Sequence, residues 1–222
     1  MKKVVIFFIL VSTFGFSQEK ITKNLGDFHE LKTYKGLSVE LIKSETPKIV
    51  IEGDKSGEVT IKNSNGVLRI SLKALETFSA NDVKVSIYFS EDIDIIDANE
   101  ASIITSKRII KQDKLVLKVQ EGGKIKLEIG TTNVEVKAVS GGKVTLEGYS
   151  ENQKVHANTG GKYEGENLKT ENTDVSVSSG SNAVINASKK VDAKATLGGT
   201  ITITGDPAEV IKKESLGGYV RH

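Results

Sequence analysis

The chain has 222 residues, with 31 lysines and arginines against 29 acidic residues, and it contains no cysteine. The balance of charge excludes the strongly basic surface that general nucleic-acid binding needs, and it excludes attachment to a membrane surface through a polybasic segment. Without cysteine there is no disulfide, so packing and backbone hydrogen bonds must hold the fold. A chain of this length can bury the core that this requires.

The first 17 residues have the three parts of a secretory signal peptide. Two lysines are followed by an apolar run from Val4 to Val11 and then by Gly15-Phe16-Ser17. The run is shorter than the roughly 20 residues that span a bilayer, so we expect cleavage before Gln18 and no membrane span in the mature chain. Removal of Lys2 and Lys3 lowers the formal charge from +2 to 0. Export predicts a location in the periplasm, on the outer-membrane surface or outside the cell.

A short N-terminal segment (18–33) precedes a region (34–82) that is predicted to form antiparallel strands. The clearest signal is Asn65-Gly66, a favoured two-residue hairpin turn that lies between two alternating apolar runs. Such strands can cap the open end of a strand stack, which otherwise invites edge-to-edge association. The stretch 73–82 is predicted to be a loop, and the strand that begins at Val83 is predicted to start the repeats.

From Gln120 to the C-terminus, one pattern recurs about every 19 residues. Six glycines take its first glycine position: Gly122, Gly141, Gly160, Gly180, Gly198 and Gly217. An apolar column keeps the same steps: Ile125, Val144, Tyr163, Ala183, Ile201 and Val220. Within each repeat the apolar residues lie two apart, as in strands with one buried face. The period indicates a coil of stacked rungs, with the glycines at corners where the backbone needs a positive φ.

A helical repeat is the alternative for this period. No repeat has the Leu-x-x-Leu-x-Leu pattern followed by a stretch of helical periodicity, and Gly, Thr, Val, Ile and Asn dominate where a helix needs Ala, Leu or Glu. We therefore predict an all-β fold. It is a single-stranded, right-handed parallel β-helix of about 19 residues per rung over residues 83–220, with an antiparallel N-terminal cap, in one domain (34–220).

The order of these segments resembles a known family, the head GIN domain of putative autotransporter adhesins, which is common in Bacteroidetes-type bacteria. The resemblance covers about residues 34–220 and rests on five segments: Glu52-Gly53-Asp54, Asn65-Gly66-Val67-Leu68, Asn99-Glu100-Ala101-Ser102, Ile201-Thr202-Ile203-Thr204-Gly205-Asp206-Pro207 and Leu216-Gly217-Gly218. Most corners here use Gly-Gly where the family uses Ser-Gly-Ala or Ser-Gly-Ser. The resemblance implies an exported β-helical protein with an adhesin-like role, and it carries over no catalytic residues.

Two charged columns follow the same period: Lys124, Lys143 and Lys162, and Glu128, Glu147 and Glu166. Stacked rungs lie about 4.8 Å apart, where two like charges in water repel by only about 1 kcal/mol. One interpretation is a solvated face on which the two columns compensate each other. The other is a ligand face that docks an acidic polymer on the lysines or Ca²⁺ on the glutamates. No other cofactor is expected.

Three asparagines, Asn133, Asn152 and Asn172, also follow the rungs and predict a structural ladder, because asparagine tolerates the left-handed conformation and bonds its own turn. The three histidines, His29, His156 and His222, have no evident partners for a metal or a nucleophile. Three tyrosines, Tyr149, Tyr163 and Tyr219, could contribute to an exposed aromatic strip, although Tyr163 fits the core equally well.

Four carboxylates precede the regular repeats: Glu91, Asp92, Asp94 and Asp97. Asp92 and Asp94 are two apart, so one strand face could present both to a cation, as polysaccharide lyases and hydrolases on β-helices require. The alternative is that they face solvent opposite Ile93 and Ile95, in ordinary strand alternation.

The function expected from these features is non-catalytic attachment through flat sheet faces. The partner would be a glycan, a cell-envelope component or another protein. A carbohydrate-active enzyme on the same coil is one alternative. A self-assembling envelope protein, which would be a homo-oligomer, is another. An enzyme predicts carboxylates that converge in a groove, whereas an assembler predicts an exposed apolar patch of several hundred Å².

Overall fold

The computed structural model describes residues 20–73 and 83–222, which are almost entirely β-structure. The predicted signal peptide and nearly all of the predicted loop at 73–82 lie outside these residues. The strands are β1 (Lys20–Asn24), β2 (Glu30–Thr33), β3 (Ser38–Lys43), β4 (Lys48–Glu52), β5 (Val59–Ser64), β6 (Val67–Leu72), β7 (Lys84–Phe89), β8 (Ile95–Ala98), β9 (Ile103–Ser106), β10 (Ile110–Val119), β11 (Lys124–Val139), β12 (Lys143–Asn158), β13 (Lys162–Val177), β14 (Asn182–Thr196), β15 (Thr200–Thr204), β16 (Glu209–Ser215) and β17 (Tyr219–Arg221). One short 3₁₀ helix, η1 (Ser56–Glu58), is present, and no described helix has the length and apolar character to cross a membrane.

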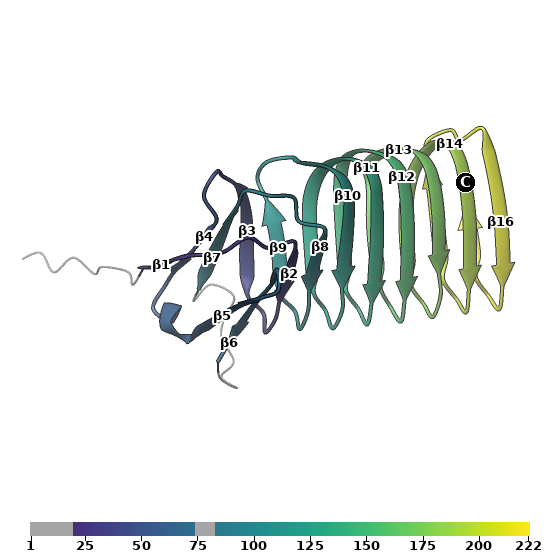
Figure 1. The fold of residues 1–222 in the computed structure, drawn as a ribbon. Coiled ribbons are helices and arrows are strands. Elements are labelled where there is room, and N and C mark those ends of the chain that lie inside the picture. The colour runs from purple at the N-terminus through teal and green to yellow at the C-terminus, as the bar shows by residue number, and fades with distance from the viewer. Residues whose placement is uncertain (1–19, 74–82) are drawn as a thin grey trace, which may run out of the picture.

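The strands from β8 onward wind into a coil in which each rung stacks in parallel on the one before it (Figure 1). β11 and β12 pair from Lys124 opposite Lys143 to Val139 opposite Asn158, a constant step of 19 residues. The inward column that begins at Ile125 is at most 1% exposed through Ile201. The predicted parallel β-helix is therefore confirmed.

Each long strand bends once, so that it contributes to two faces of the coil. In β11, every second residue from Ile125 to Thr131 is buried, and burial then resumes at Val134. A step of three breaks the two-residue period of a strand and so marks a corner. We call the surface before this corner the first face; it comprises β3, β7, β9, β15, β17 and the first halves of β11–β14. The second face comprises β2, β6, β8, β10, β16 and the second halves.

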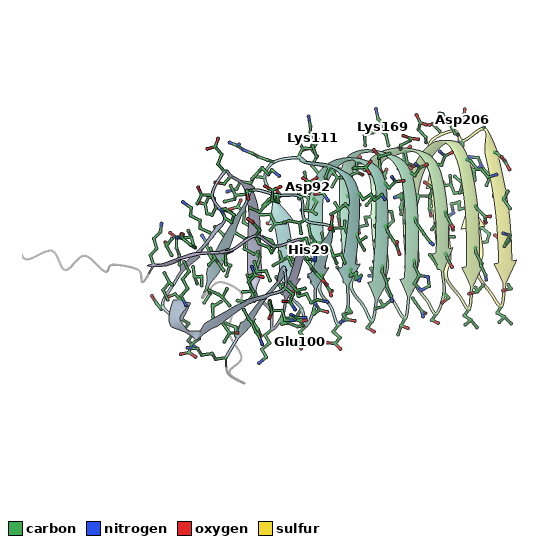
Figure 2. The ribbon with its side chains drawn as sticks, in the orientation of Figure 1. His29, Asp92, Glu100, Lys111, Lys169 and Asp206 are labelled. Atoms are coloured by element: carbon green, nitrogen blue, oxygen red, sulfur yellow. The ribbon has the colours of Figure 1, made fainter. Side chains whose placement is uncertain are left out.

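Tight turns join the second face of one rung to the first face of the next. In most of these turns a non-glycine residue and the following glycine both have positive φ, as in Glu121 (52°) and Gly122 (74°), whereas the turn between β8 and β9 uses Glu100 (49°) and Ala101 (60°). The structure places all six predicted corner glycines at such positions, with φ between 68° and 76°. These are the dihedral signs of a type I′ turn, which reverses a chain in two residues. Glu100 marks this edge of the coil in Figure 2, whereas Lys111, Lys169 and Asp206 mark the opposite edge.

The N-terminal part is a mixed sheet rather than a purely antiparallel one. β1–β4, β4–β7 and β5–β6 are antiparallel, and the last pair includes the predicted hairpin. However, β2 pairs in parallel with β6 and β8, while β3 pairs in parallel with β7 and β9. The unit β2–β3, joined by its own tight turn at Lys35-Gly36, is thus a rung inserted between β6–β7 and β8–β9. Residues 30–33, expected in a separate segment, belong to this stack.

At the last described rung, charged residues replace the apolar core columns. In β16, Lys212 stands opposite Ala193 and Glu214 opposite Ala195, both of which point into the core. The Glu214 carboxylate accepts a hydrogen bond from the backbone N–H of Val220 at 2.6 Å. Inward-pointing charges disfavour the addition of a further strand, so this rung is a poor template for edge-to-edge pairing.

A buried polar cluster joins the inserted rung to the coil. Lys32 Nζ lies 2.8 Å from Glu30 Oε1 and 3.5 Å from Asp97 Oδ2. Asn99 donates to Asp97 Oδ1 at 3.1 Å. These side chains are largely shielded from water, so their ion pairs are screened less than surface pairs. The hydrogen bond from Lys32 holds the pKa of Glu30 below its usual range.

Replacement of Glu30 by glutamine is expected to lower the free energy of unfolding by about 1–2 kcal/mol at neutral pH, since Lys32 loses its closer partner. The pKa of Glu30 is lowered by folding, so its contribution is present above the unfolded value of about 4.3 and is lost as the pH falls through the folded value. The difference between wild type and Glu30→Gln should therefore shrink below about pH 4. Urea unfolding across pH measures it, with exposed Glu45→Gln as control; a difference independent of pH would contradict the argument.

Candidate functional site

The lysine column of the first face forms as a column, but its charge is partly neutralised. Lys124, Lys143 and Lys162 stand opposite one another in consecutive strands. Lys143 Nζ lies 2.7 Å from Glu164 Oε1, and its hydrogen bond holds the pKa of Glu164 below the usual range. The first face therefore resembles the solvated, self-compensating surface of the first interpretation.

The glutamate column is interrupted at its third member. Glu128 stands opposite Glu147, but Glu147 stands opposite Asn167, so Glu166 is out of register. The cause is the extra residue in this rung, which the register shift beyond Thr145 places as a bulge in β13. The prediction of a three-glutamate column was therefore wrong, and only Glu128 and Glu147 stay in register.

The four early carboxylates do not converge. Glu91, Asp92 and Asp94 lie in the connection between β7 and β8 rather than on a strand, so the expectation of a shared strand face was wrong. Asp92 pairs with Lys43 at 3.6 Å, whereas Asp97 is buried beside Lys32. Within residues 20–73 and 83–222, no three histidine, cysteine or acidic residues are grouped in a way that could hold a metal ion.

The tyrosines do not make a common strip. Tyr163 is 1% exposed and accepts a hydrogen bond from the Gln153 amide inside the coil. Tyr149, 47% exposed, donates to Glu171 Oε1 at 3.4 Å near the corner, and Tyr219, 53% exposed, lies in the last strand of the first face. Because these three tyrosines lie apart, they do not form an aromatic platform for a ligand.

The three asparagines form a hydrogen-bonded ladder along the corner between the faces. Asn152 Nδ2 donates to Asn133 Oδ1 at 3.2 Å, and Asn172 Nδ2 donates to Asn152 Oδ1 at 3.0 Å. All three side chains are half-buried. Asn152 therefore both accepts and donates along the coil axis, and the predicted ladder is present, although none of the three residues has the left-handed conformation expected of asparagine there.

Replacement of Asn152 by leucine should lower the free energy of unfolding by about 1–2 kcal/mol, because it removes both ladder bonds at once. Thermal and urea unfolding measure the effect. The control is Asn182→Leu, at an exposed site whose side chain makes no hydrogen bond to a described residue. Unchanged stability of the Asn152 variant would contradict the structural role.

A shallow groove follows the second-face side of this ladder. It consists of two adjoining hollows of about 230 and 260 Å³ that share Asn152 and Gln153. The residues that line it come from successive rungs: Lys114, Leu115, Val116, Asn133, Val134, Glu135, Asn152, Gln153, Lys154, Asn172, Thr173, Asp174, Lys190 and Asp192. Amides, charged groups and an apolar floor thus repeat along the coil axis, which suits an extended ligand better than a compact one.

Next to this groove, a second basic column runs along the second face. Its members pair in register across six consecutive strands: Lys118, Lys137, His156, Ser176, Lys194 and Lys213. This basic column was not predicted, although its steps of 19, 19, 20, 18 and 19 are those of the corner glycines. Its member His156 is exposed to solvent.

These features define a β-solenoid whose core is filled by side chains and whose polar groups are presented on long, flat faces. The chain belongs to the family described as "Putative auto-transporter adhesin, head GIN domain", whose model matches residues 27–207. The resemblance seen in the sequence is thereby confirmed. No curated protein matches the chain.

Solved structures of similar proteins share the fold. A putative adhesin from Bacteroides fragilis NCTC 9343 has a TM-score of 0.83 at 16% identity, covering 93% of this chain and 97% of its own. A putative adhesin from Parabacteroides merdae ATCC 43184 has a TM-score of 0.73 at 18% identity, covering 93% and 96%. A putative lipid binding protein from Parabacteroides distasonis ATCC 8503 has a TM-score of 0.68 at 15% identity, covering 93% and 96%.

Proposed function

We propose that this protein is an exported, non-catalytic attachment module that binds a glycan chain of the cell envelope or its surroundings. The observation that carries the proposal is the groove along the asparagine ladder, which offers charged groups on successive rungs from β10 to β14 and asparagine amides on β11, β12 and β13. A ligand that itself repeats along one direction can use the same contact in each rung. Each contact is weak, and many together hold the ligand as multivalent binding does.

Export is part of the same proposal. The three-part N-terminal pattern supports it, and membership of an adhesin-like family agrees with it. The periplasm, the outer-membrane surface and the extracellular space all fit these features. No cofactor is required by the proposed binding mode, since hydrogen bonds and charges of the chain itself make the contacts.

The alternatives fit the geometry less well. Hydrolysis of a glycosidic bond needs two carboxyl groups held on either side of it, about 5–9.5 Å apart, and the best candidates from the sequence lie apart, with Asp97 tied to Lys32. Assembly through the coil end is opposed by Lys212 and Glu214 at core positions. A glycan also suits the amide-lined groove better than a lipid tail, because each ladder amide keeps further donor and acceptor positions that hydrocarbon cannot satisfy.

A glycan-array screen of the purified mature chain (18–222) tests the proposal, with and without Ca²⁺, after light scattering has established the oligomeric state. We expect retention of a limited set of glycans by the monomer, unchanged by Ca²⁺. Retention that depends on Ca²⁺ would contradict the cofactor-free mode. No retention of any glycan would overturn the proposal and favour a protein partner or, with large particles in solution, self-assembly.

A further inference from the structure

We propose that the basic column of the second face is the binding site for a linear acidic polysaccharide, whose carboxylate or sulfate groups pair with Lys118, Lys137 and Lys194. This inference rests on the proposed function and names the class of glycan. It differs from the charged columns expected from the sequence, which lie on the first face.

The second-face column keeps three lysines in register without an ion pair to any described residue, against two in the first-face column. On the first face, Lys143 pairs with Glu164 at 2.7 Å and neighbouring Lys126 lies 3.9 Å from Glu147, whereas Lys124 and Lys162 make no ion pair with a described residue. On the second face, Lys118, Lys137 and Lys194 make no ion pair with any described residue, and Lys213 is held by Asp192 at 3.2 Å. Three lysines in one line are therefore available to an anionic partner.

The geometry of the basic column matches a polymer rather than a single ion. Its six positions span five rung spacings, about 24 Å, with a side chain at every 4.8 Å or so. A linear polymer that carries acidic groups at intervals along its length can therefore pair with several members of the column at once. None of the six positions is acidic, but Asp97 stands opposite Lys118 at the β8 end of the column, and Glu135, Asp174 and Asp192 belong to the adjacent column that lines the groove.

The surface on both sides of the basic column offers hydrogen-bonding groups to the sugar rings of such a polymer. The groove lies along the side of the basic column that faces the asparagine ladder, and small polar side chains flank the other side: Asn158, Ser178, Thr196 and Ser215. Hydroxyl and amide groups of this kind hydrogen-bond to sugar hydroxyls. Single-stranded nucleic acid is the competing linear polyanion, but its bases need aromatic side chains for stacking. The residues that line the groove and the basic column include no Phe, Tyr or Trp.

The test compares two triple variants with the same change in charge on opposite faces. The first is Lys118→Gln/Lys137→Gln/Lys194→Gln, and the matched control is Lys124→Gln/Lys143→Gln/Lys162→Gln. Binding of the mature chain to polygalacturonate is measured by affinity electrophoresis or biolayer interferometry, with fully methyl-esterified polygalacturonate of equal length as the uncharged probe. Circular dichroism and thermal unfolding verify the fold of each variant.

We expect the wild type to bind polygalacturonate and to bind its ester far more weakly. One close opposite charge in water is a factor of about five in affinity, so the second-face variant should bind about 100-fold more weakly at low salt, and the difference should shrink in high salt. The first-face variant should bind within about threefold of the wild type, because Glu147 and Glu164 lie among the lysines of that face and repel a polyanion there. The gain-of-charge variant Ser176→Lys, which fills the gap in the column, should tighten binding about fivefold.

Three results would overturn the inference. Equal losses in both triple variants would indicate a net-charge effect, and equal binding of acid and ester would remove the role of charge while leaving glycan attachment intact. Equal binding of a single-stranded DNA with the same number of charges would reassign the site to polyanions in general. If the second-face triple variant fails to fold, Ser176→Lys decides: unchanged affinity contradicts the inference. Failure of every glycan to bind would instead refute the proposed function itself.

Discussion

Replacement of Gly161 by alanine is expected to lower the free energy of unfolding by about 2–4 kcal/mol, although this glycine does not have a positive φ. The reason is that the backbones of two stacked rungs lie very close together at this corner. A Cβ at Gly161 would overlap the carbonyl oxygen of Ala138 in the preceding rung, and backbone atoms cannot rotate away as a side-chain end can. The rung would have to separate from its neighbour and weaken the ladder at that corner. Urea unfolding followed by circular dichroism measures the loss.

Its neighbour Gly160 supplies the matched control within one turn. Gly160 has φ 72°, but a Cβ there would meet no atom within 4 Å. Gly160→Ala should therefore lower the free energy of unfolding only by the strain of alanine in the left-handed conformation, about 1–2 kcal/mol. Ser102 and Ser181 occupy the place of Gly161 in two other turns, so a side chain is compatible with the turn itself. A larger loss at Gly160 than at Gly161 would show that backbone conformation, rather than stacking, limits these corners.

Replacement of Tyr163 by alanine is expected to cost about 3–5 kcal/mol, the range for deletion of a buried aromatic side chain. Tyr163 stands in a column of otherwise smaller residues, and its ring fills the space left by Gly165, where a Cβ would overlap the phenol. Burial raises the pKa of the phenol far above its usual value. The hydroxyl is therefore a neutral partner for the Gln153 amide, and the pair closes the core where the bulge in β13 disturbs the stack.

Tyr163→Phe separates the two contributions. It keeps the ring but leaves the Gln153 amide, 3% exposed, without its acceptor, so we expect a loss of about 1–3 kcal/mol. Thermal and urea unfolding of both variants, with the urea slope compared to that of wild type, test this order. If Tyr163→Phe is as stable as wild type, the hydrogen bond contributes nothing. If Tyr163→Ala costs less than Tyr163→Phe, the ring does not fill the core as described.

The regular coil could be predicted from the sequence because each rung repeats the same local choices. The step between corner glycines fixes which residues stack, so the column from Ile125 to Val220 and the asparagine ladder followed directly. The 20-residue step showed that one rung holds an extra residue. It could not show where the residue bulges, because Glu166 and Asn167 are both polar and either could leave the ladder. The position depends on how Tyr163 and Gly165 pack.

The N-terminal part was less predictable because its pairings are not between neighbours in sequence. β2 lies between β6 and β8, and β3 between β7 and β9. Strands of four to six residues carry the same alternation in either arrangement, so pattern alone cannot choose a partner. The turn at Lys35-Gly36 was the available signal for a rung, since it repeats the dihedral signs of the later corners.

The early carboxylates and the basic column also show which features of the candidate site the sequence can predict. Asp92 and Asp94 alternate with Ile93 and so suggest a strand, but the chain there crosses from one face to the other and only the burial of Ile93 is retained. The basic column could have been predicted from the sequence, because Lys118 and Lys137 keep the 19-residue step. Lysines between buried residues are ordinary in strands, and only the structure shows that a groove adjoins the second-face column.

The most direct test of attachment without catalysis is the chain length of a bound glycan over time. A glycan retained on the array is incubated with the mature chain under binding conditions for a day, and its length distribution is measured by size-exclusion chromatography with and without the protein. Bound glycan of unchanged length is the result predicted for an attachment module. A shift to shorter chains would contradict it and establish the solenoid as an enzyme.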